Sequence, residues 1–85
     1  MKPNLIVTFQ SATNGEPWQE IATGKYQFVD GEYRRVSLPK FLPDQVLNDF
    51  EQKLPGLQHS TWDYNGISHV DAVGNSRYQA LITPE

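Results

Sequence analysis

The sequence predicts an α+β domain in which an antiparallel sheet of five or six strands is covered on one face by one main helix. Three observations predict this architecture. Short segments alternate apolar and polar residues, glycine-containing turn dipeptides separate these segments, and one stretch spaces its apolar residues at the helical period. The chain has 85 residues, so we expect a single small domain over 1–85.

The first strand is predicted at 4–10, where apolar and β-branched residues predominate. Asn14–Gly15 is a turn dipeptide. The next segment, 17–23, has two interpretations. Pro17 could open a short helical turn, or the Asn14–Gly15 turn could close a hairpin that pairs this segment with the first strand. We favour the helical turn.

A hairpin is predicted over 25–38, with its turn at Asp30–Gly31. A two-residue loop would place Phe28 opposite Tyr33. A three-residue loop, with Gly31 in the left-handed conformation, separates apolar from polar side chains better, and we favour it. It leaves Tyr33 and Arg35 pointing outward. The side chains that it turns inward are Tyr26, Phe28, Val36 and Leu38.

The main helix is predicted over 43–54. Pro43 suits the first helical position, Asp44 complements the positive end of the helix dipole, and Pro55–Gly56 ends the helix. The apolar residues fall on one stripe, which should lie on the sheet. That stripe consists of Val46, Leu47, Phe50 and Leu54. The residues expected to face away from the sheet are Gln45, Asn48, Asp49, Glu51 and Gln52.

A three-stranded meander is predicted over 59–83, with two-residue turns at Asn65–Gly66 and Gly74–Asn75. Counting from the turns places Trp62 opposite His69 and His69 opposite Ala80. Both turns aim the same, mostly aromatic and apolar, set of residues toward the helix. The main members of this inward set are Trp62, Tyr64, His69, Tyr78, Ala80 and Ile82.

Composition excludes several classes of protein. The chain has no cysteine, so it can form neither disulfides nor cysteine-based metal sites. No apolar run approaches the roughly 20 residues of a membrane-spanning helix, and the N-terminal residues lack a secretory segment. With a formal net charge of −3, the expected protein is acidic, cytoplasmic and without a membrane partner.

Ser60, His69 and Asp71 are the residue types of a hydrolase triad. In the predicted register, however, Asp71 lies opposite Ser60 and His69 lies one row away. The sequence also contains no Gly-x-Ser-x-Gly nucleophile elbow. We therefore predict no catalytic residues, and keep a small hydrolase or lyase centred on His69 and Asp71 as an alternative.

Two histidines and two nearby aspartates could be considered as metal ligands. The predicted register points His59 and His69 to opposite faces of the sheet, so one ion could not use both. The glycines are scattered at turns and form no phosphate-binding loop. We therefore expect neither a metal nor a cofactor.

Nucleic-acid binding is a further alternative, and it would use the hairpin Lys25–Ser37. This segment interleaves cations with aromatic residues that could stack on bases. The negative net charge and the acidic residues at the hairpin tip argue against it.

The function that we favour is non-enzymatic binding to another protein, in the manner of a small inhibitor, immunity or adaptor protein of a phage or mobile element. Trp18 and Tyr33 have no place in the predicted core and could anchor a partner. Arg35 could form an ion pair, while Asp49 and Glu51 could steer a basic surface toward the helix. An uncovered sheet edge or face could also pair with a second copy of the chain.

Overall fold

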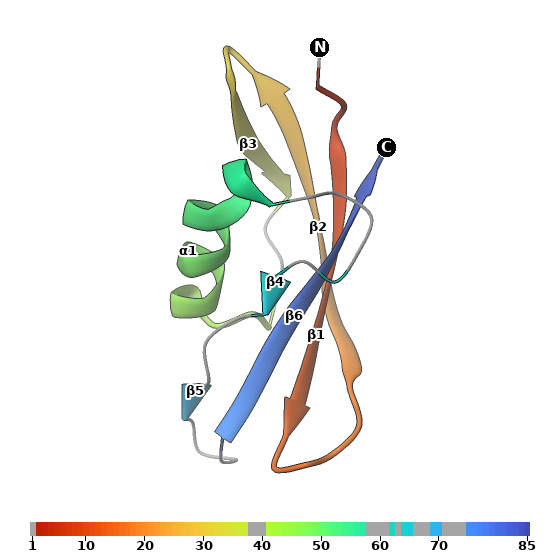
Figure 1. Ribbon diagram of the computed structural model, residues 1–85, viewed down its shortest axis with the longest axis vertical. Coiled ribbons are helices and arrows are strands. Elements are labelled where there is room, and N and C mark those ends of the chain that lie inside the picture. Colours follow the sequence, from red (N-terminus) through yellow and green to blue (C-terminus); the bar gives the residue numbers. More distant parts are fainter. Residues whose placement is uncertain (1, 38–40, 58–61, 63, 66–68, 71–74) are drawn as a thin grey trace.

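The computed structural model describes residues 2–37, 41–57, 62, 64–65, 69–70 and 75–85 (Figure 1). Along the chain, the elements are β1 (Leu5–Thr13), β2 (Gln19–Val29), β3 (Glu32–Ser37), α1 (Asp44–Lys53), the 3-10 turn η1 (Leu54–Gly56), β4 (Tyr64–Asn65), β5 (His69–Val70) and β6 (Asn75–Pro84).

The strands form one antiparallel sheet in the order β3-β2-β1-β6. β4 and β5 pair with the other edge of β6. The start of β1 pairs with the end of β6, so the two termini lie near each other (Figure 1). The predicted α+β class, with an antiparallel sheet and one main helix, is confirmed. The five or six strands are not found as expected, because in the described part of the chain four long strands make the sheet and β4 and β5 have two residues each.

The predicted helical turn at 17–23 is wrong, and the alternative hairpin is right. Asn14 and Gly15 both have positive φ, 50° and 80°, as a tight hairpin turn requires. β2 then pairs with β1 from Gln19 onward. A long ladder of interstrand hydrogen bonds outcompetes a single helical turn, whose nucleation is unfavourable.

The β2–β3 hairpin has the two-residue loop, so the favoured three-residue loop is wrong. Val29 pairs with Glu32, and the loop residues Asp30 and Gly31 have φ of 52° and 85°. This turn matches the right-handed twist of the strands, an advantage that outweighs the better separation of apolar residues. As a consequence Val36, expected inside, is 54% exposed.

The register of the hairpin shifts by one residue between Lys25 and Tyr26. Tyr26 lies opposite Arg35 and is buried. Arg35 therefore shares the helix-facing side of the sheet with Tyr26 and does not point outward as expected.

The predicted meander at 59–83 is also wrong. Tyr64 pairs with Ala80, and His69 pairs with Ser76 instead of Ala80. β4 and β5 thus run in the same direction along consecutive parts of β6, so the chain does not reverse between them as the Asn65–Gly66 turn would require. The predicted inward direction of Tyr64, Tyr78, Ala80 and Ile82 is nevertheless confirmed, since all four are buried.

Trp62, expected to point inward, is 38% exposed. The alternation of faces holds only within a strand, and β4 begins after Trp62, at Tyr64. Strand alternation therefore predicts the direction of Tyr64 correctly but does not apply to Trp62.

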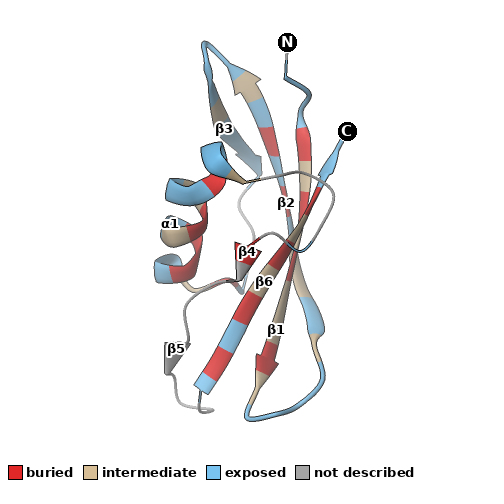
Figure 2. Ribbon diagram, in the orientation of Figure 1, coloured by how far each residue is buried: buried red, intermediate tan, exposed pale blue. Residues whose placement is uncertain are grey.

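The helix lies close to its predicted range of 43–54. Pro43 takes the N-cap position, one residue before the position expected for it, and η1 follows the helix at Leu54. The side of α1 that faces the sheet is buried along its length (Figure 2). The predicted apolar stripe of Val46, Leu47, Phe50 and Leu54 is confirmed, with every member buried.

Phe50 is the centre of the contact between helix and sheet. Its ring meets the rings of Phe9 and Tyr64 edge to face, at centroid distances of 5.0 Å and 5.2 Å, and lies 5.9 Å from that of Tyr26. Edge-to-face pairs add to the stabilisation that burial of the rings already provides. The cluster joins β1, β2 and β4 to α1.

We predict that Phe50→Ala lowers the free energy of unfolding by about 3–5 kcal/mol, because it removes a fully buried ring and leaves a cavity. Urea unfolding followed by circular dichroism measures this change. Gln52→Ala, on the exposed side of the same helix, is the control and should stay within about 0.5 kcal/mol of the parent. Equal losses for the two variants would contradict the central role of Phe50.

Candidate functional site

A groove of about 430 Å³ runs between β3 and the C-terminal end of α1. We call it the β3 groove. On one side it is bounded by the edge strand of the sheet, and on the other by the last turn of the helix and the start of η1. Its lining residues are Tyr26, Glu32, Tyr33, Arg34, Arg35, Glu51, Leu54 and Pro55.

The alternation of β3 explains how one strand contributes both of its faces to this groove. Tyr33 lies opposite Phe28 and Arg35 lies opposite Tyr26, so both point to the helix side. Glu32 and Arg34 belong to the other face. Because all four line the groove, it extends around the edge of the sheet.

Glu51 connects the helix to this edge. Its Oε2 accepts a hydrogen bond of 2.8 Å from the hydroxyl of Tyr26 and lies 3.1 Å from Nε of Arg35. Burial, followed by the hydrogen bond to Glu51, raises the pKa of Tyr26 far above its ordinary value. The phenol of Tyr26 therefore stays a proton donor, and Arg35 is held in place beside it.

Asp49 makes a parallel set of contacts on the other side of Phe50. Its Oδ2 accepts a hydrogen bond of 2.7 Å from the hydroxyl of Tyr64 and lies 3.2 Å from Nζ of Lys53. The hydrogen bond from Tyr64 lowers the pKa of Asp49, and Lys53 contributes in the same direction. Burial, and then Asp49, raise the pKa of Tyr64.

The expectation that Asp49 and Glu51 face solvent is wrong. Their side chains are only 23% and 27% exposed, and each accepts a hydrogen bond from a tyrosine of the sheet. Helical spacing places them beside the apolar stripe, but tyrosine hydroxyls from β2 and β4 reach them. Glu51 still lines the β3 groove, whereas Asp49 does not.

Tyr33 is anchored at the same edge. Its hydroxyl donates a 3.3 Å hydrogen bond to the carbonyl of Pro3, and its ring meets that of Phe28 edge to face at 5.1 Å. Lys2 lies 5.6 Å above the Phe28 ring. Pro3 and Lys2 thus contact the Tyr33–Phe28 pair, of which Tyr33 lines the groove.

Trp18 lies elsewhere, in the connection between β1 and β2, and does not line the β3 groove. The guanidinium of Arg77 sits 5.3 Å from the centre of its ring, in a cation–π contact. Of the five residues predicted to contact a partner, the structure therefore brings together Tyr33, Arg35 and Glu51. Asp49 and Trp18 stand apart.

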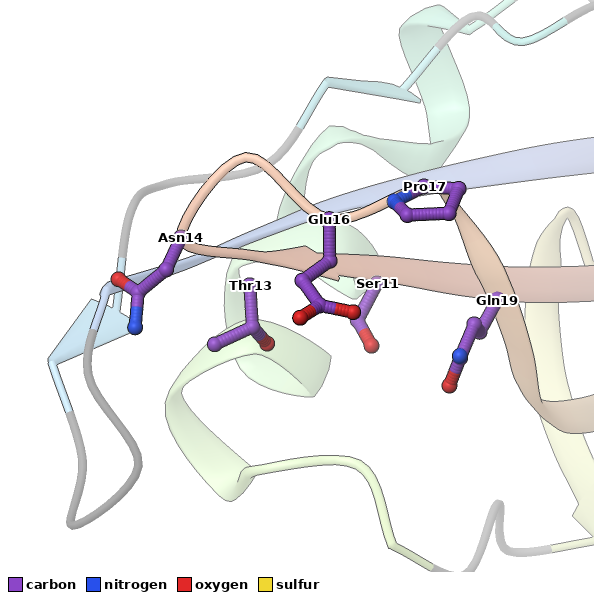
Figure 3. Close-up of a pocket in the computed structure, with 6 residues that line it drawn as sticks. All are labelled: Ser11, Thr13, Asn14, Glu16, Pro17 and Gln19. Atoms are coloured by element: carbon purple, nitrogen blue, oxygen red, sulfur yellow. The ribbon is translucent and has the colours of Figure 1, made fainter.

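A second hollow, of about 260 Å³, lies at the β1–β2 connection (Figure 3). Polar side chains predominate around it, and Glu16 is the one ionisable residue among those that line it. Apart from Pro17 this lining is polar, so it offers no large apolar anchor point for a ligand. Its residues are Ser11, Thr13, Asn14, Glu16, Pro17 and Gln19.

The alternative catalytic and metal-binding residues lie mostly outside the described part of the chain. This applies to Ser60 and Asp71, and also to His59. Within the described residues no three histidine or acidic side chains are grouped as metal ligands would be. Over the same residues, no helix has both the length and the apolar character needed to cross a bilayer.

The sequence did not predict that residues of the hairpin and of the helix end line one groove. Leu54 and Pro55 line it from η1. The two-residue loop sets the register of β3 and so brings Glu32 and Arg34 to the groove. The closing Asp30–Gly31 dipeptide was the signal that could have found them. Phe41 is 87% exposed and has a φ of 68°, a conformation unusual for a bulky residue.

Comparison of the chain with protein-family models, with curated protein sequences and with solved structures finds no match in any of the three.

We predict that the Tyr26 and Tyr64 hydroxyls ionise only when the protein unfolds at alkaline pH. Their folded pKa values are raised above 10.0, so the stabilisation is complete below that pH and is lost as pH rises further. Phenolate absorbance and far-ultraviolet circular dichroism, recorded in one titration, should show a shared cooperative step. Tyr26→Phe should reduce the absorbance of that step. Ionisation of both residues ahead of unfolding would contradict the prediction.

We predict an opposite dependence for Asp49 at acid pH. Its folded pKa is lowered, so its contribution is present above the ordinary value of 3.8 and is lost as pH falls through the folded pKa. Asp49→Asn should therefore be less stable than the parent at neutral pH, and the difference should shrink in acid. Urea unfolding across this pH range measures the difference. A gap that stays constant with pH would show that the charge of Asp49 does not matter.

Proposed function

We propose that this chain is a non-enzymatic module that binds another protein through the β3 groove. The observation that carries the proposal is the convergence of Tyr33, Arg35 and Glu51 on one groove at the edge of the sheet. Tyrosine and arginine are the residue types enriched where protein partners bind most tightly.

The groove is already organised for binding. Arg35 is held by Glu51, and Glu51 by Tyr26, so these side chains lose little conformational freedom when a partner docks. The groove volume of about 430 Å³ lies within the roughly 300–1,000 Å³ of typical binding pockets. It suits a protruding side chain or short segment of the partner.

The charges of the groove indicate what kind of partner surface fits. Arg34 lies 3.4 Å from Glu32, and Arg35 lies 3.1 Å from Glu51, so each cation has an acidic neighbour. A polyanion would have to compete with these carboxylates, and this disfavours the nucleic-acid alternative. A protein segment with mixed polar and apolar side chains fits better.

The proposed class remains that of a small inhibitor, immunity or adaptor protein acting in the cytoplasm. Size, acidic balance and the lack of cysteine support it, since such proteins act by covering a surface and need no catalytic group. Asp49 supports this role indirectly, by fixing the helix that forms one wall of the groove.

The test is affinity capture from a lysate of the source cells, with bound proteins quantified by mass spectrometry. Arg34→Ala should reduce recovery of the specific partner several-fold, because it removes a groove side chain that has only an exposed ion pair to lose. Lys25→Ala removes the same charge from an exposed position on β2 outside the groove, and should leave recovery unchanged.

Circular dichroism of both variants checks that each is folded as the parent is. A partner recovered equally with Arg34→Ala and the parent would contradict binding through the groove. Loss of the partner with Lys25→Ala alone would place the binding surface elsewhere.

A further inference from the structure

β3 is the outer strand of the sheet, and within the described part of the chain no strand lies beyond it. Four of its six residues are exposed in succession at its C-terminal end, and the hairpin stands at the margin of the molecule (Figure 1). An edge of this kind can pair with a strand from another chain. The question is which strand it fits.

The two-residue turn fixes which backbone groups of β3 point outward. The pair that closes the turn, Val29 and Glu32, exchanges hydrogen bonds, and such pairs alternate along an antiparallel ladder. Glu32 and Arg34 therefore direct their backbone groups toward β2. The backbone groups of Tyr33 and Arg35 are directed away from β2, toward the open edge. A strand added there must place an outward-directed residue of its own opposite Tyr33.

The side chains of β3 are self-complementary in charge. On the face away from the helix, Glu32 and Arg34 stand two residues apart and carry opposite signs. A two-fold axis through Tyr33 sets Glu32 of one copy opposite Arg34 of the partner subunit, and Arg34 opposite the partner's Glu32. If the two-fold axis passed through Arg34 instead, Arg34 would lie opposite the partner's Arg34, and this pair of like charges is unfavourable.

We propose that a second copy of this chain docks on β3, forming a symmetric dimer in which the two β3 strands pair antiparallel about Tyr33. Hydrogen bonding permits two-fold axes at Tyr33, Arg34 or Arg35, and the charges favour the axis at Tyr33, because the other two set arginines opposite each other. Tyr33 keeps its contacts with Phe28 and Pro3 in this arrangement, since both lie on its own chain. The two sheets become one continuous antiparallel sheet, with both helices on the same side.

The dimer goes beyond the proposed function, because it requires no foreign partner. The paired segment is short, so the dimer should be weak and should dissociate on dilution.

The test uses charge reversal and sedimentation velocity across a concentration series. Arg34→Glu places acidic residues opposite each other, and Glu32→Arg places cations opposite each other, so each single variant should be monomeric where the parent is dimeric. The two single variants mixed together should form a mixed dimer, because their charges are again complementary. The double reversal, Glu32→Arg with Arg34→Glu, should dimerise as the parent does.

A single-cysteine variant tests the register, since the parent chain has no cysteine. Tyr33→Cys should form a disulfide-linked dimer under mild oxidation, because the two positions face each other at about 5.5 Å between Cα atoms. Gln27→Cys, on β2, should not.

A parent chain that stays monomeric at all concentrations would overturn the dimer and leave binding to a foreign protein intact. Charge-reversal variants that dimerise as well as the parent, or a mixture no more associated than its components, would overturn the β3 pairing. Cross-linking through Gln27→Cys and not through Tyr33→Cys would overturn the register.

Discussion

The packing of Phe50 against the rings of Phe9, Tyr26 and Tyr64 is the contact on which the rest of the structure depends. α1 has 10 residues, and a helix of this length is marginal in isolation. Its stability comes from the sheet that it covers, and the buried side of that sheet needs the helix in turn. The aromatic cluster connects the two layers at the middle of the helix.

Polar bonds on both sides of Phe50 give this apolar contact a defined orientation. Asp49 accepts a hydrogen bond from Tyr64 and Glu51 accepts one from Tyr26, so the helix is held by two tyrosines from different parts of the sheet. Ring packing alone tolerates rotation of a helix about its axis, whereas two directional bonds do not. Glu51 also holds Arg35, so the bond that orients the helix also shapes the β3 groove.

Sequence patterns that are compatible with one local structure predict it correctly. Patterns that are compatible with several strand pairings do not. The helix at 43–54 was predictable because its spacing, its first-turn residues and its terminating Pro55–Gly56 agree. The inward set of β6 was predictable because alternation has only two phases. The meander failed because Asn65–Gly66 is compatible with a hairpin turn, yet β4 and β5 find a longer partner in β6. Tyr33, Arg35 and Glu51 are candidates for partner binding by residue type alone. The sequence did not predict that all three line one groove.

The amino-acid sequence by itself determined the α+β class, the helix and its buried stripe, because these follow from periodicities that each segment carries alone. Tertiary structure decided the pairing partners of 17–23 and of the segments before β6, since strand pairing depends on which edges compete for the same ladder. It also decided the role of Asp49 and Glu51. Helical spacing fixes the position of each acidic residue on the helix, but only the packed sheet supplies the tyrosine hydroxyl that its carboxylate binds.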